Sequence, residues 1–151
     1  MTPYSHTFEL AADRATVFRL FSDPRQLDSL TPSWFRLQPI GALPDLLEPG
    51  VEISYRLRWR GLPLRWTSLV TDYEENAFLA YEQKRGPYRH FRHEHFFSES
   101  DGATRVCDRV VFRTLGGRAA DRWVVLPDLK RIFVSRERAA QARVVDAKRI
   151  P

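Results

Sequence analysis

The chain has 151 residues, a length typical of one domain, and its 43% hydrophobic content is far above that of a disordered chain. The net charge of +5 comes mostly from arginine, but acidic residues are interspersed, which disfavours a nucleic-acid-binding arm. No apolar stretch approaches the roughly 20 residues of a membrane-spanning helix, and the first residues lack a secretory pattern. The single cysteine, Cys107, cannot form an internal disulfide, which suits the reducing cytoplasm, and we expect a cytoplasmic protein. From the mixed charge pattern we expect no nucleic-acid partner.

A strand and two short helices are predicted at the N-terminus. Aromatic and aliphatic side chains alternate with polar ones over residues 4–10, the period of a half-buried strand. Asp13 is a suitable N-cap for a helix over residues 14–21. Asp23, followed by a proline at the first helical position, then begins a second short helix that ends near Leu30.

The middle of the chain is predicted to form further strands. Turn signals separate segments at residues 34–40, 51–60, 64–73, 77–84, 88–97 and 104–112, and a longer loop covers residues 41–50. Because the other connections are as short as those of hairpins, we expect one antiparallel sheet in which sequential strands pair.

The last third of the chain is predicted to be a long helix. Leu129, Ile132, Phe133, Arg136 and Ala140 recur at helical spacing on one face, and charged residues occupy the other. Pro127 marks either the start of this helix or a kink inside it. We expect a single domain over residues 1–143, followed by a frayed basic tail over 144–151.

This order of elements resembles the helix-grip arrangement of the SRPBCC or START-like superfamily, which includes the birch-pollen allergens. The segments DPRQLDSLTP, GPYRHFRHEHFF and LKRIFVSRE resemble in particular bacterial ligand-binding or polyketide cyclase/dehydrase-like members. The resemblance implies an α+β helix-grip fold, with a curved antiparallel sheet of about seven strands around a long C-terminal helix and two short helices after strand one. It also implies a hydrophobic cavity between sheet and helix, but no particular reaction.

The segment 88–97 carries the main functional signal. Side chains two apart in a strand share a face, so Phe91, His93, His95 and Phe97 point one way, and the opposite face contains Tyr88, Arg92 and Glu94. We assign the first set to the cavity. Asp108, on the next strand, is assigned to the same buried side because the other side of that strand carries three arginines.

A buried carboxylate needs a hydrogen-bond or ion-pair partner, and His93 or His95 is the natural donor to Asp108. One hypothesis is a polar network that orients a ligand, and we favour it. The other is a His/Asp acid/base pair of a cyclase or dehydratase, with His93 and Asp108 as candidate catalytic residues. The same three residues suit zinc or non-haem iron, but no further ligand is clearly placed, so we expect no metal and no cofactor.

The predicted partner is a small, largely hydrophobic molecule of lipid, polyketide or aromatic type, bound without catalysis by a monomer or a homodimer. The residues expected to contact it are Trp34, Tyr55, Trp59, Trp66, Phe78, Gln83, Phe91, His93, His95, Phe97, Asp108, Phe112 and Phe133. A further hypothesis concerns a convex outer face bearing Arg56, Arg58, Arg60 and Arg65, which would dock an anionic partner.

Overall fold

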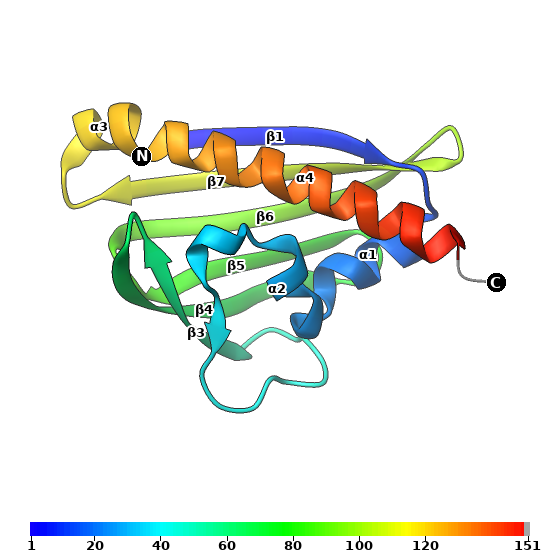
Figure 1. The fold of residues 1–151 in the computed structure, drawn as a ribbon, viewed down its shortest axis with the longest axis horizontal. Coiled ribbons are helices and arrows are strands. Elements are labelled where there is room, and N and C mark those ends of the chain that lie inside the picture. The colour runs from blue at the N-terminus through cyan, green and yellow to red at the C-terminus, as the bar shows by residue number, and fades with distance from the viewer. Residues whose placement is uncertain (150–151) are drawn as a thin grey trace.

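The computed structural model describes residues 1–149, except the side chains of residues 148 and 149. One antiparallel sheet of seven strands, in the order β1-β7-β6-β5-β4-β3-β2, curves around a long C-terminal helix that lies across it (Figure 1). The helix-grip fold and the two short helices after the first strand, both implied by the resemblance, are confirmed.

The elements follow one another with short connections, apart from the loop before the third strand. The first half contains β1 (Thr2–Leu10), α1 (Arg14–Ser22), a 3-10 turn (Pro24–Gln26), α2 (Leu27–Leu30), a second 3-10 turn (Ser33–Phe35), β2 (Gln38–Pro39) and β3 (Glu52–Trp59). The second half contains β4 (Leu62–Glu74), β5 (Phe78–Arg85), β6 (Tyr88–Ser100), β7 (Ala103–Thr114), α3 (Gly117–Ala120), a π-helical turn (Asp121–Val125) and α4 (Leu126–Arg149).

The two N-terminal helix starts form as their caps predict. The Asp13 carboxylate accepts a hydrogen bond from the backbone N–H of Thr16 at 3.2 Å, and Asp23 accepts one from that of Arg25 at 3.0 Å. The strand predicted over residues 34–40 is wrong, because only β2 pairs with β3 there. Arg36 adopts a left-handed backbone conformation, with φ of 47°, which interrupts an extended strand.

Two-residue turns with positive φ close the tightest hairpins. Arg60 and Gly61, with φ of 50° and 80°, join β3 to β4. Arg60 therefore does not lie on the convex strand face to which the sequence assigned it, and it pairs with Asp128 of α4 instead. A register shift between Tyr88 and His90 in β6 also changes the face on which a side chain lies. It moves Tyr88 to the cavity side.

A buried carboxylate fixes the start of the C-terminal helical segment against the sheet. Asp121 is 2% exposed and accepts hydrogen bonds from the Thr114 backbone N–H at 3.0 Å, the Thr114 hydroxyl at 2.6 Å and the Thr2 hydroxyl at 3.0 Å. These contacts join the segment to the ends of β7 and β1. As a result, α4 begins at a defined place above the concave face of the sheet.

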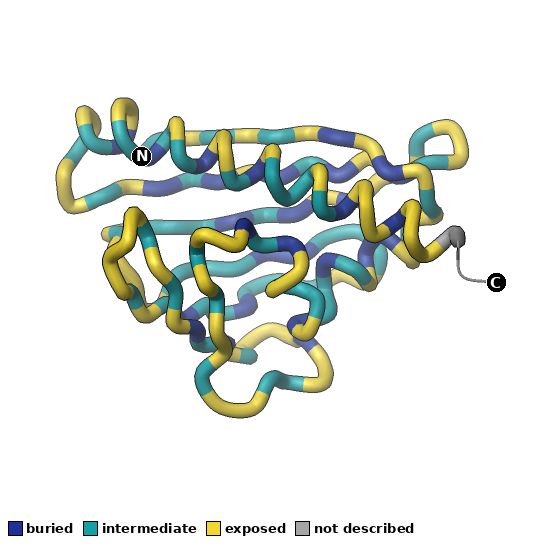
Figure 2. Tube along the Cα trace, viewed as in Figure 1, coloured by how far each residue is buried: buried dark blue, intermediate teal, exposed yellow. Residues whose placement is uncertain are grey.

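Helix α4 runs farther than the sequence predicted. It is continuous through Arg149 and buries Val144, so it passes the expected beginning of the tail at residue 144. Residues 150 and 151 of that predicted tail lie outside the described residues. The buried positions gather on the faces of sheet and helix that meet (Figure 2). No helix among the described residues is long and apolar enough to span a membrane.

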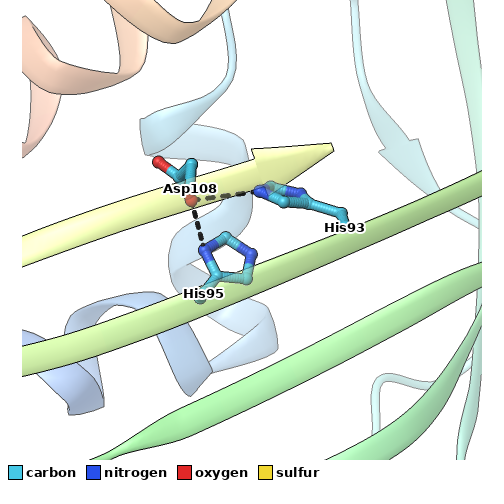
Figure 3. A group of neighbouring side chains, drawn as sticks. All are labelled: His93, His95 and Asp108. Carbon is cyan, nitrogen blue, oxygen red and sulfur yellow. Dashed lines mark hydrogen bonds and ion pairs between the residues drawn. The ribbon is translucent and has the colours of Figure 1, made fainter. Parts of the chain in front are cut away.

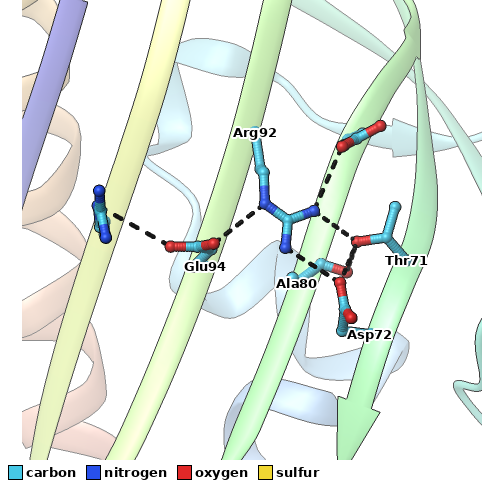
Figure 4. Close-up of polar contacts among 7 residues, drawn as sticks. Thr71, Asp72, Ala80, Arg92 and Glu94 are labelled. Carbon is cyan, nitrogen blue, oxygen red and sulfur yellow. Dashed lines mark hydrogen bonds and ion pairs between the residues drawn. The ribbon is translucent and has the colours of Figure 1, made fainter.

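On the convex face of the sheet, Arg92 is the centre of a polar network. Its guanidinium contacts the carboxylates of Asp72 and Glu94 at 3.0 Å and of Glu82 at 3.3 Å, and donates to the Thr71 hydroxyl at 2.9 Å (Figure 4). The network ties β4, β5 and β6 together. This confirms that Arg92 and Glu94 point away from the cavity.

Candidate ligand-binding cavity

A cavity of about 460 Å³ lies beneath α4. Most of its wall is aliphatic or aromatic, with residues from α1, the central strands and α4, a composition typical of sites for apolar small molecules. The sheet contributes Leu57 and Leu64, and the helix contributes Leu129 and Ile132. The cavity predicted between sheet and helix is therefore present.

Most of the predicted contact residues line this cavity. They are Tyr55, Trp59, Trp66, Gln83, Phe91, His93, His95 and Phe133. Three of the rings form a compact aromatic wall, since the centroid of Phe91 lies 5.0 Å from that of Trp66 and 4.9 Å from that of Tyr88. Strand alternation positions the two histidines and Phe91 on one face, as the sequence predicted.

Five predicted contact residues lie elsewhere. Phe97 and Phe112 are in the buried core, and Asp108 lies behind the histidines with 1% exposure. Trp34 is 50% exposed and stacks with Arg131 outside the main cavity. Phe78 pairs with Phe96 across the strands, 4.8 Å between centroids, on the convex face.

The position of Phe78 follows from strand periodicity. Phe78 and Gln83 are five positions apart in β5, an odd offset, so they cannot both point inward from a regular strand. The inward set is Leu79, Tyr81 and Gln83. Tyr81 was missed although the same alternation indicates it.

The polar centre of the wall is a cluster of three buried side chains. His93 Nε2 lies 3.0 Å from Asp108 Oδ1, and His95 Nδ1 lies 2.6 Å from the same oxygen (Figure 3). His95 and Asp108 are directly opposite each other in the β6–β7 register. The His93 contact has hydrogen-bond geometry, whereas His95 Nδ1 is close to the oxygen but poorly aligned with it.

Burial sets the charge state of the cluster. It lowers the pKa of His93 to about 3, the neighbouring His95 acts in the same direction, and the bond to Asp108 opposes only part of this. Burial by itself would raise the pKa of Asp108, but the two histidines more than offset this and lower it. At neutral pH His93 is therefore a neutral imidazole that donates through Nε2 to a carboxylate, which leaves Nδ1 as an acceptor.

The same cluster supplies metal-ligating atoms of suitable type. One atom from each of His93, His95 and Asp108 lies within 4.8 Å of the others, and this donor set suits zinc or non-haem iron. The 3.0 Å contact of His93 is a hydrogen bond to the carboxylate oxygen, whereas His95 Nδ1 lies 2.6 Å from the same oxygen without hydrogen-bond geometry. The two imidazoles therefore meet the carboxylate directly at Oδ1.

Other polar groups reach the cavity wall. The hydroxyl of Tyr55 is buried and has no hydrogen-bond partner among the described residues. Burial raises the pKa of Tyr55 and of Tyr81, so both phenols stay protonated at neutral pH. Gln83 is different, because its amide already brackets the β5–β6 turn, donating to the carbonyl of Tyr88 at 2.8 Å and accepting from its N–H at 3.1 Å.

Arg136 is the residue of the wall whose importance the sequence did not reveal. It lies on the predicted apolar face of α4, lines the cavity, and places its guanidinium 5.7 Å from the ring centroid of Phe133 and 5.9 Å from that of Phe21. A charged residue at helical spacing among apolar ones was the available signal.

Comparison with known proteins establishes the fold. No protein-family model and no curated protein matches the chain. Among solved structures it is similar to protein Ms6760 of Mycobacterium smegmatis, at 19% identity, over 96% of this chain and 92% of that one, with a TM-score of 0.73.

Two further solved structures are also similar to the chain. The crystal structure of Ara h 8.0201 matches at 15% identity, over 96% of this chain and 98% of that one, with a TM-score of 0.70. Major latex-like protein 151 of Panax ginseng matches at 11% identity, over 94% and 96%, with a TM-score of 0.72. The chain therefore has the helix-grip fold that its sequence predicts.

Proposed function

We propose that this protein binds a small, largely apolar molecule in the cavity beneath α4, without transforming it. The observation that carries this proposal is the cavity of about 460 Å³ with its mostly aliphatic and aromatic wall. Burial of the ligand would contribute about 25 cal/mol for each Å² of apolar surface removed from water. His93 would orient the ligand through its free Nδ1, which accepts a hydrogen bond.

Binding is tested with a neutral fluorescent probe and a matched pair of variants. N-phenyl-1-naphthylamine should bind saturably to the wild-type protein, and native mass spectrometry should detect a co-purified apolar molecule. Ile132→Trp fills the cavity and should weaken probe binding about tenfold or more. Val134→Trp, on the exposed side of the same helix, should leave it unchanged. Absence of saturable binding, or equal binding by both variants, would contradict the proposal.

The bond between His93 and Asp108 favours a second candidate function, a cyclase or dehydratase-like reaction with this pair as acid and base. The low pKa of His93 disfavours it, since a proton donor works best with a pKa near the working pH. His93→Gln distinguishes the two functions once a substrate is identified. Loss of turnover with retained binding would support the reaction, and parallel loss of both would support binding alone.

The remaining expectations concern the state of the protein in the cell. We infer that it works in the cytoplasm as a monomer or a homodimer. Light scattering coupled to gel filtration decides between the two assemblies, and cell fractionation tests the compartment. A membrane-associated or secreted pool as the main fraction would contradict the cytoplasmic assignment.

A further inference from the structure

One positive charge in the cavity wall, that of Arg136, has no ion-pair partner in the part of the chain that the structure describes. The Nε of Arg136 is buried and has no hydrogen-bond partner among the described residues. The adjacent carboxylate, Glu137, turns away and pairs with His6 at 2.9 Å. The rings of Phe21 and Phe133 contact the guanidinium but offer no oxygen acceptor for its N–H donors.

The carboxylates that border the cavity are paired with other residues. Asp23 pairs with Arg25 at 3.0 Å, Glu82 with Arg92 at 3.3 Å, and Asp128 with Arg60 at 3.1 Å. Asp108, behind the wall, meets the two buried histidines through Oδ1, while its buried Oδ2 has no hydrogen-bond partner among the described residues. Arg136 therefore contributes a positive charge to an apolar cavity whose bordering carboxylates, Asp23, Glu82 and Asp128, are ion-paired elsewhere.

Neutral donors accompany this charge. The Tyr55 hydroxyl, on a side chain that is 5% exposed, is buried without a partner among the described residues. Tyr81 lines the same wall; burial raises the pKa of its phenol, and the positive charge of Arg136 opposes part of this rise. A guanidinium that shares a cavity wall with two phenol groups suits the planar oxygen pair of a carboxylate, to which arginine binds through two parallel hydrogen bonds.

We propose that the apolar ligand of this cavity carries a carboxylate, which Arg136 binds as an ion pair and to which Tyr55 donates a hydrogen bond. This inference rests on the proposed binding function and specifies its ligand class as an amphipathic monocarboxylic acid. The apolar part of the acid would occupy the region of Leu57 and Leu64, and the carboxylate would neutralise the guanidinium.

The test is displacement of N-phenyl-1-naphthylamine at pH 7.5 by two competitors of equal chain length, decanoic acid and 1-decanol. A charge-assisted hydrogen bond makes the acid the better competitor by about 10- to 100-fold. Arg136→Met keeps a side chain of similar length and should abolish this preference while it retains probe binding. Arg136→Lys, which preserves the charge, should keep part of it.

Arg138→Met is the matched control, because Arg138 is exposed on the same helix and outside the cavity. It should behave as wild type. Equal displacement by acid and alcohol in the wild type, or an acid preference that survives Arg136→Met, overturns the carboxylate assignment while the binding function stands. Failure of the neutral probe to bind would overturn the binding function and this inference with it.

Discussion

His93 Nε2 lies 3.0 Å from Asp108 Oδ1, and this bond joins neighbouring strands inside the wall of the cavity. It couples an imidazole held neutral by burial to a carboxylate held ionised by its two histidine partners. A change in the protonation state of this pair would therefore alter both the stability of the fold and the polarity of the cavity wall.

The first prediction concerns the pH dependence of stability. The pKa of His93 is about 3 in the folded protein and about 6.5 in an unfolded chain, so between these values only the unfolded chain binds the proton. Stability is complete above pH 6.5 and falls as the pH is lowered, with a contribution of up to about 1.4 kcal/mol per pH unit from this residue. Urea unfolding at pH 7.5, 6.0, 5.0 and 4.5 measures the slope.

Two variants separate this contribution from that of surface carboxylates. His93→Gln does not titrate and should show a correspondingly shallower slope between pH 6 and 4.5. His90→Gln should keep the wild-type slope, since His90 lies on the same strand outside the cavity lining. An unchanged slope in His93→Gln would show that His93 does not resist protonation in the folded state.

The second prediction concerns Asp108. Asp108→Asn can keep an oxygen toward the two imidazoles, but it removes the negative charge and places an NH2 group where the buried Oδ2 has no partner among the described residues, so the free energy of unfolding should fall by about 1–3 kcal/mol at pH 7.5. Asp101→Asn, in the exposed β6–β7 turn, should have little effect. The double variant with His93→Gln should be non-additive because the two residues are in contact. A neutral or stabilising Asp108→Asn would contradict this account.

Much of the fold was predictable from local patterns. Strand alternation placed His93, His95 and Asp108 on one buried side, because a period of two determines the face of every side chain once one is assigned. It failed for Tyr88, because a register shift moves that residue to the cavity face, and such a shift has no clear signature in a single sequence.

The electrostatics of the site were less predictable. Arg136 was visible on the apolar face of the helix. That it has no ion-pair partner among the described residues could not be predicted, because the nearby carboxylates pair with residues distant in sequence: Glu137 with His6 of β1, and Asp128 with Arg60 of the β3–β4 turn. These contacts are set by the placement of α4 over the sheet. Strand alternation therefore predicted the inward histidines and the family resemblance implied the cavity, but neither predicted the charge within it.

The third prediction concerns Tyr55, whose buried hydroxyl has no partner among the described residues. Tyr55→Phe removes a polar group that is costly to bury, so the ligand-free protein should be more stable by up to about 1 kcal/mol in urea unfolding. The same change should weaken decanoate binding severalfold but leave binding of N-phenyl-1-naphthylamine intact. A loss of stability in Tyr55→Phe would show that the hydroxyl is already hydrogen-bonded in the folded protein.

The last prediction concerns the clamp between the β3–β4 hairpin and α4. Asp128 accepts hydrogen bonds from the Trp59 indole at 2.9 Å and from Arg60 at 3.1 and 3.2 Å, at the border of the cavity. Because Arg60 is largely exposed, Asp128→Ala should lower the free energy of unfolding by only about 1 kcal/mol.

The larger effect of Asp128→Ala should be kinetic. Without the clamp the hairpin tip separates from the helix more often, and local opening of this kind governs how fast a buried ligand leaves. Stopped-flow measurements should therefore show faster release of N-phenyl-1-naphthylamine, whereas Asp146→Ala, at an exposed position on the same helix, should release it at the wild-type rate. Identical release rates for both variants would show that the ligand does not pass between the hairpin tip and α4.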